Sequence, residues 1–188
     1  APERATPEVY LERGLTDVPD EGILSSGVPA AFGALVNVMA RFGQLTFAEV
    51  VTPALDYART GFPVHSGLYG QELFGIRDLE EKFRNQWSGS AKIYLPQGMV
   101  AKVGQVIENP ALADLLNYLK TKEQAASGDR QKGLDAVLES FYRGDPATEI
   151  ERFSQERNGL LARSDLERFE THFEEPVSMQ FADTKVFK

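Results

Sequence analysis

Residues 46–61 read TFAEVVTPALDYARTG, and this stretch predicts a helix with recognisable ends. Thr46 and Glu49 have the capping-box spacing, in which each side chain binds a backbone N–H group that the helix leaves without a partner. Gly61 is predicted to end the helix in a left-handed conformation, whereas Pro53 predicts either a kink or the start of a second helix. Apolar residues recur between these ends at the helical period, at Phe47, Val50, Val51, Ala54, Leu55 and Ala58.

Comparable signals on both sides of this stretch predict a mainly helical chain. Proline in the first helical turn and glycine after the last one are typical of helix ends. An amphipathic stretch from Leu68 to Trp87 carries Leu73, although Gly70 and Gly75 weaken it as a helix. The other predicted helices run from Thr6-Pro7 to Gly14, Pro29 to Gly43, Asn109-Pro110 to Leu119, Leu134 to Gly144 and Asp145-Pro146 to Asn158-Gly159, and a short helix begins at the capping box Ser164–Glu167.

Two stretches predict short strands. Residues 93–106 contain the apolar runs IYL and MVAKV around a PQG turn, so strands are expected near 93–106. Residues 177–187 alternate apolar and polar side chains before a turn at Asp183-Thr184, so a hairpin is expected near 177–187. Polar loops are expected at 15–28 and 121–133. We therefore expect residues 1–188 to form a single helical-rich region, mainly α with short β-hairpins.

The composition is that of a packed protein that lacks a cationic surface. Of the 188 residues, 42% are hydrophobic and 26% are charged. Twenty Lys and Arg against 28 Asp and Glu give a net charge of -8, which disfavours a nucleic-acid or anionic-lipid partner. No apolar run approaches the ~20 residues of a membrane span. The absence of cysteine excludes disulfides, thiolate metal sites and cysteine nucleophiles.

Residue types that carry chemistry do not converge in the sequence. His65 and His172 stand in different segments without a metal-binding spacing, and the acidic pairs Glu80-Glu81 and Glu174-Glu175 fit a solvated surface. Ser25-Ser26-Gly27 could hold a nucleophile, but no base lies near it in sequence, so a loop that binds its own backbone is the simpler interpretation. No phosphate-binding glycine motif occurs. We therefore predict no catalytic, cofactor-binding or metal-binding residue.

Several short sequence motifs nevertheless occur in an order that indicates a family. They are Ala1-Pro2 with Tyr10-Leu11, Ser26–Pro29, Phe42-Gly43 with Pro53-Ala54 and Ala58–Val64, Asn109–Ala113, Phe141–Gly144, Asn158–Leu161 with Ser164–Leu166, and Glu175–Val177. In this order they resemble the large subunit of γ-glutamyltransferases (glutathione hydrolases), which are N-terminal-nucleophile hydrolases. The resemblance spans nearly the whole chain. It departs from the family at Ala30, where glycine is usual, and at Asn158, which replaces the first glycine of a Gly-Gly pair.

The resemblance implies both a fold and an activity. The fold is the helical part of the large subunit of an αββα sandwich. The enzyme is a zymogen that cuts itself into two subunits, so that a threonine becomes the N-terminus of the small subunit and acts as the nucleophile. It transfers the γ-glutamyl group of glutathione or a related amide to an amino acid or to water. Family members usually carry an export signal, which implies a periplasmic or secreted protein.

The resemblance also places both halves of the active site outside these residues. The threonine is expected beyond Lys188. The arginine that binds the substrate carboxylate is expected just before Ala1, in the Arg-Glu pair of the family's Arg-Glu-x-Ala-Pro motif, whose Ala-Pro is matched by Ala1-Pro2. Glu3-Arg4 is not that pair, because its order is reversed and it follows Ala1-Pro2. We therefore expect an inactive interior fragment whose partners are the remainder of the large subunit and the small subunit, with the glutathione-like substrate bound only by the parent. Uncovered apolar surface predicts some self-association.

Two alternatives stay open. The departures from the family pattern fit a divergent acylase-like member with a different amide substrate. The composition by itself also permits a stand-alone helical interaction or binding module with no parent enzyme.

Overall fold

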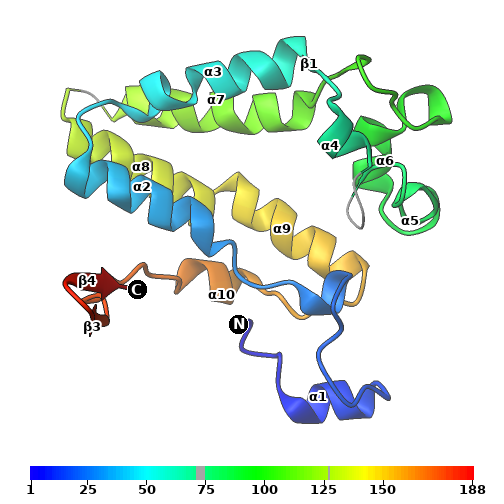
Figure 1. Ribbon diagram of the computed structural model, residues 1–188, viewed down its shortest axis with the longest axis horizontal. Helices are drawn as coiled ribbons and strands as arrows, with labels where there is room; N and C mark the ends of the chain where they lie inside the picture. The colour runs from blue at the N-terminus through cyan, green and yellow to red at the C-terminus, as the bar shows by residue number, and fades with distance from the viewer. Residues whose placement is uncertain (71–74, 127) are drawn as a thin grey trace. The chain divides into compact units, whose positions relative to one another are not determined.

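The computed structural model describes residues 1–70, 75–126 and 128–188. It is mainly helical with short antiparallel strand pairs, which confirms the expected class (Figure 1). The chain divides into two compact units, one made of Ala1–Gly43 with Tyr142–Lys188 and the other of Gln44–Phe141. Within the described residues, no helix combines the length and the apolar character that crossing a membrane requires.

The contiguous unit is built on two neighbouring helices, α3 (Phe47–Thr60) and α7 (Pro110–Ala125), which lie side by side in Figure 1. Leu55 and Ala58 of α3 are buried in one cluster with Ala113 of α7. The other elements are β1 (Phe62–Pro63), α4 (Ser66–Tyr69), α5 (Glu80–Asn85), α6 (Ser88–Tyr94), a 3-10 turn (Pro96–Gly98), β2 (Val106–Ile107) and α8 (Arg130–Tyr142), whose last residue belongs to the other unit.

Three side chains make hydrogen bonds to the backbone N–H groups at the start of α3. The predicted capping box is present, because Glu49 donates its N–H to Thr46 Oγ1 (3.2 Å) and Thr46 donates its N–H to Glu49 Oε2 (2.8 Å). Glu123 reaches over from α7, and its two carboxylate oxygens accept the N–H groups of Phe47 (2.6 Å) and Ala48 (2.7 Å). Glu123 is only 8% exposed, and it lies at the helix end where the macrodipole favours negative charge.

Three sequence-based predictions in this unit are wrong. Residues 93–95 are not a strand, because Ile93 and Tyr94 end the helix α6 and Tyr94 stacks on Phe83 with ring centroids 5.4 Å apart. Tertiary packing outweighs the β-propensity of so short a run. Strand pairing starts only at β2, which pairs antiparallel with β1.

The loop predicted at 121–133 is largely helical. α7 continues to Ala125 and α8 begins at Arg130, while residue 127 lies outside the described residues. The hydrogen bonds that Glu123 accepts from Phe47 and Ala48, at the start of α3, stabilise this continuation of α7.

The predicted helix from Leu68 to Trp87 is not continuous either. It is divided into α4 and α5, and Leu73 lies outside the described residues. Pro53, by contrast, lies inside an uninterrupted α3. Gly61 ends α3 as predicted, but its φ of 83° is combined with a ψ of 170°, so it is not in the left-handed helical region. A Cβ atom there would lie 2.4 Å from Val106 Cγ1, so β2 also requires glycine at this position.

The other unit combines the two ends of the chain. Its elements are α1 (Pro7–Glu12), a 3-10 turn (Ile23–Ser25), α2 (Ala30–Phe42), α9 (Asp145–Glu156), α10 (Arg163–Glu167), β3 (Ser178–Phe181) and β4 (Thr184–Phe187). The buried phenol of Tyr142 accepts the N–H of Gly33 (3.0 Å) and donates to the carbonyl of Pro29 (2.7 Å). Burial raises the pKa of Tyr142, and the Gly33 N–H partly opposes this shift.

The hairpin expected near 177–187 is present. β3 and β4 pair antiparallel, with Met179 opposite Val186. Its apolar side chains are exposed, and Val177 and Phe181 reach 77% and 70% exposure. One face of the hairpin is therefore apolar and uncovered within this chain.

Replacing Glu123 with Gln should destabilise the contiguous unit. Glutamine has a single acceptor oxygen, so one of the two N–H groups at the start of α3 would face an NH₂ group and the favourable charge would be lost. We expect the free energy of unfolding to fall by about 1.5–3 kcal/mol, measured by urea denaturation. Asp114→Asn, an exposed change on the same helix, should alter it by less than ~0.5 kcal/mol. Equal losses in the two variants would contradict this role of Glu123.

Replacing Gly33 with Ala should destabilise the other unit, although alanine is the better helix former. A Cβ atom at position 33 would lie 2.8 Å from Tyr142 Oη and 2.9 Å from Phe169 Cε1. Overpacking of this kind costs about 1–3 kcal/mol, which exceeds the ~1 kcal/mol gain in helix propensity. Gly89→Ala in α6 meets no atom within 4 Å and should instead stabilise the chain, as thermal unfolding followed by circular dichroism would show. A rise in melting temperature for Gly33→Ala would refute the packing argument.

Candidate functional site

A carboxylate at the start of α10 connects the two ends of the chain. Asp165 is 8% exposed, and its two oxygens accept the N–H groups of Glu3 (2.8 Å) and Ala162 (2.9 Å). The capping box predicted at Ser164–Glu167 is therefore displaced, because Ala162 precedes the helix and Ser164 lies inside it. Asp165 reaches back three residues, as the acidic residue of a capping box does.

The segment before α1 is held at further points. The Arg168 guanidinium pairs with the Glu3 carboxylate, and this hydrogen-bonded pairing raises the pKa of Arg168. The two side chains are 60% and 69% exposed, so water weakens the ion pair. Pro2 is buried, and its carbonyl accepts the N–H of Ala5 (3.0 Å), which closes a turn over Glu3. Asp165 is shielded from water, so its hydrogen bond contributes more than the exposed ion pair to holding the segment before α1.

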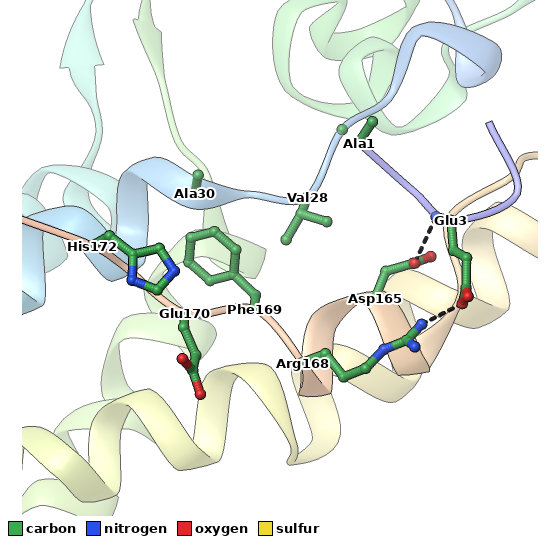
Figure 2. Close-up of a pocket in the computed structure, with 10 residues that line it drawn as sticks. Ala1, Glu3, Val28, Ala30, Asp165, Arg168, Phe169, Glu170 and His172 are labelled. Carbon is green, nitrogen blue, oxygen red and sulfur yellow. Dashed lines mark hydrogen bonds and ion pairs between the residues drawn. The ribbon is translucent and has the colours of Figure 1, made fainter. Parts of the chain in front are cut away.

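A hollow of about 630 Å³ opens beside Asp165. Figure 2 shows Ala1 and Glu3 along one part of it and side chains of α10 and the following segment along another. Glu170 and His172 lie away from the Glu3–Arg168 pair. The hollow is lined by carboxylate groups together with a guanidinium and an imidazole, so it offers hydrogen-bond acceptors and donors to a small polar group.

Other residues considered in the sequence have local structural contacts. His65 precedes α4, and its Nδ1 accepts the N–H of Leu68 (3.2 Å). Ser25 donates its hydroxyl to the carbonyl of Gly22 (2.8 Å), so this loop does bind its own backbone. On α5, Glu80 pairs with Arg84, and Glu81 accepts a hydrogen bond from Asn85.

The remaining candidates are not drawn into a common site. Glu174 and Glu175 are exposed in the segment before β3, and His172 lies at the hollow described above. Trp87 packs against a buried cluster of its own, contiguous unit, near Phe83. Among the residues the structure describes, no three His, Asp or Glu side chains gather in a manner suited to a metal ion.

Sequence reasoning missed the contacts that position the hollow. The hydrogen bond between Glu3 and Asp165 joins residues 162 positions apart. No local pattern reveals such a pair, because periodicity and capping signals describe only neighbours in the sequence. The usable signal was Asp165 itself, an acidic residue in the first turn of a short helix.

Comparison with curated proteins reveals relatives of greater length. The glutathione hydrolase proenzyme of Bacillus subtilis (strain 168) is 26% identical over 181 residues, which are 94% of this chain and 27% of that protein. The glutathione hydrolase proenzyme of Pseudomonas aeruginosa is 26% identical over 192 residues, covering 100% of this chain and 30% of that protein. The chain therefore spans less than a third of the length of these two relatives.

Solved structures share the fold. Gamma-glutamyltranspeptidase from Helicobacter pylori matches 100% of this chain and 49% of its own, with a TM-score of 0.82 and 20% identity. Cephalosporin acylase from Bacillus halodurans matches 100% of this chain and 33% of its own, with a TM-score of 0.81 and 24% identity. The helical architecture is therefore that of part of these enzymes. The family model described as Gamma-glutamyltranspeptidase matches residues 1–188, and the chain belongs to this family.

Proposed function

We propose that the full-length protein containing these residues transfers or hydrolyses the γ-glutamyl group of glutathione or of a related amide. The reaction would pass through an acyl-enzyme on the N-terminal threonine of the small subunit. The match of the gamma-glutamyltranspeptidase family model to residues 1–188 carries this proposal. The relatives from Bacillus subtilis and Pseudomonas aeruginosa, both glutathione hydrolase proenzymes, support a precursor that is cut into subunits.

Within that protein, residues 1–188 would form a helical part of the large subunit and would not contain the nucleophile. An arginine in an Arg-Glu pair just before Ala1 would bind the substrate carboxylate through its planar guanidinium group. The hollow beside Ala1 and Glu3 supports this assignment, because it lies where that segment would enter. The partners would be the remainder of the large subunit and the small subunit, and the protein would be periplasmic or secreted.

A second candidate is an acylase that acts on a different amide. The likeness to cephalosporin acylase from Bacillus halodurans, at a TM-score of 0.81, favours keeping this candidate. The two candidates share the nucleophile and differ in the acyl group that they accept. A substrate panel therefore separates them.

The full-length protein should release p-nitroaniline from γ-glutamyl-p-nitroanilide. Mass spectrometry of the quenched enzyme should find the γ-glutamyl adduct on the N-terminal threonine of its small subunit. Residues 1–188 expressed alone, and shown by circular dichroism to be helical, should release none. Turnover by the isolated residues would overturn their assignment as a non-catalytic part. A full-length protein that is not cut, or that acts only on other amides, would overturn the γ-glutamyl proposal.

The exposed hairpin should make the isolated residues self-associate. In the parent, we propose that the other parts of the enzyme cover its apolar face, which includes Val177, Met179 and Phe181 at 77%, 62% and 70% exposure. Sedimentation equilibrium of residues 1–188 should show an average mass above the monomer at high concentration. Met179→Lys with Phe181→Lys should restore the monomer, whereas Glu174→Lys with Asp183→Lys should not. A monomer of the unmodified residues at every concentration would contradict the idea.

A further inference from the structure

We propose that Asp165 is a positioning residue that fixes the segment Ala1–Glu3 and, through it, the arginine that binds the substrate carboxylate. The inference rests on the proposed function, which places that arginine just before Ala1. It adds a role for a carboxylate that does not touch the substrate.

The hydrogen bonds of Asp165 are well suited to hold a chain segment. Both oxygens are used, one by Glu3 (2.8 Å) and the other by Ala162 (2.9 Å). The residue is 8% exposed, so water competes little for these bonds. A hydrogen bond to an ionised carboxylate is shorter and stronger than one between neutral groups. Asp165 therefore ties the backbone of Glu3 to the start of α10.

The segment attached to this anchor has little freedom. Pro2 is buried, and the N–H of Ala5 donates to its carbonyl (3.0 Å), so Glu3 occupies the second position of a turn. The Glu3 side chain also pairs with Arg168, and Figure 2 shows both interactions converging on Glu3. Backbone and side chain of Glu3 are thus held by two residues of one short segment.

The distance from the anchor to the proposed arginine is short. In the pattern Arg-Glu-x-Ala-Pro, the arginine stands three residues before Ala1. An extended chain advances about 3.5 Å per residue, so the Cα atom of the proposed arginine would lie within roughly 11 Å of Ala1. Ala1 and Glu3 line the hollow, so the segment that carries the proposed arginine would join the chain beside it. A shift of Ala1–Glu3 would therefore move the guanidinium relative to the substrate.

Misplacement of a guanidinium that binds the substrate carboxylate through two hydrogen bonds lowers the rate of the reaction strongly. A displacement of about 1 Å, even when it originates away from the reacting atoms, lowers rates by up to ~100-fold. The loss would be confined to substrates that carry the carboxylate. Loss of general stability would instead affect all substrates alike. This difference separates positioning from a merely structural role.

The experiment compares two substrates in the full-length enzyme. γ-Glutamyl-p-nitroanilide carries the α-carboxylate, and 4-aminobutyryl-p-nitroanilide is the same molecule without it. The ratio of their kcat/KM values measures how well the carboxylate is recognised. Asp165→Asn should lower this ratio about tenfold, mainly through a higher KM for the γ-glutamyl substrate. Asp20→Asn, an exposed loop change, should leave the ratio unaltered.

A second pair of variants keeps the test valid if Asp165→Asn fails to fold. Glu3→Pro removes the backbone N–H group that donates a hydrogen bond to Asp165. Proline is favoured at the second position of a turn. Glu3→Ala removes only the exposed ion pair with Arg168. We expect about a tenfold fall in the ratio for Glu3→Pro and less than about twofold for Glu3→Ala.

The outcomes distinguish the two proposals. A wild-type ratio near one would mean that no carboxylate clamp exists, so the proposed function and this inference would fall together. A large wild-type ratio that survives in folded Asp165→Asn and Glu3→Pro would overturn the positioning role alone. A fall confined to the γ-glutamyl substrate in both variants would establish it.

Discussion

Backbone N–H groups at the start of a helix have no partner within that helix, and two buried carboxylates resolve this constraint here. Glu123 binds two such groups of α3 from the neighbouring α7, and Asp165 binds the residue before α10 together with Glu3. Each carboxylate thereby fixes how one segment packs on another. The hollow beside Ala1 depends on the second of these contacts, because Asp165 holds one of its walls in place.

The helix boundaries were largely predictable because their signals are local. The capping box at Thr46 and the termination at Gly43 depend on neighbouring residues and are found where the sequence indicates. Residues 93–95 and 121–133 were mispredicted because distant contacts decide their structure, the stacking of Tyr94 on Phe83 and the binding of α3 by Glu123. The hollow could not be predicted for the same reason, since its two sides come from opposite ends of the chain.

The residues that carry the resemblance to the family are ones that shape the fold. The sequence motifs that resemble those of γ-glutamyltransferases lie at helix ends and at positions of close packing. Examples are the start of α7 at Asn109-Pro110 and the end of α3 at Gly61. These positions preserve architecture, and the fold is shared with enzymes whose names specify different substrates. A shared scaffold of this kind permits changes of substrate without changes of packing.

The contact between Glu3 and Asp165 also orders the events of synthesis. One unit is contiguous, at Gln44–Phe141, whereas the other needs residues from both ends of the chain. A ribosome delivers residues in sequence, and compact units fold as they emerge. The contiguous unit can therefore fold while Ala1–Gly43 remains unpacked, because the residues with which this segment forms a unit have not yet been made. Ala1–Gly43 can pack in its final place only after α10 has left the exit tunnel, so a stall of synthesis before that point would leave this unit unfolded.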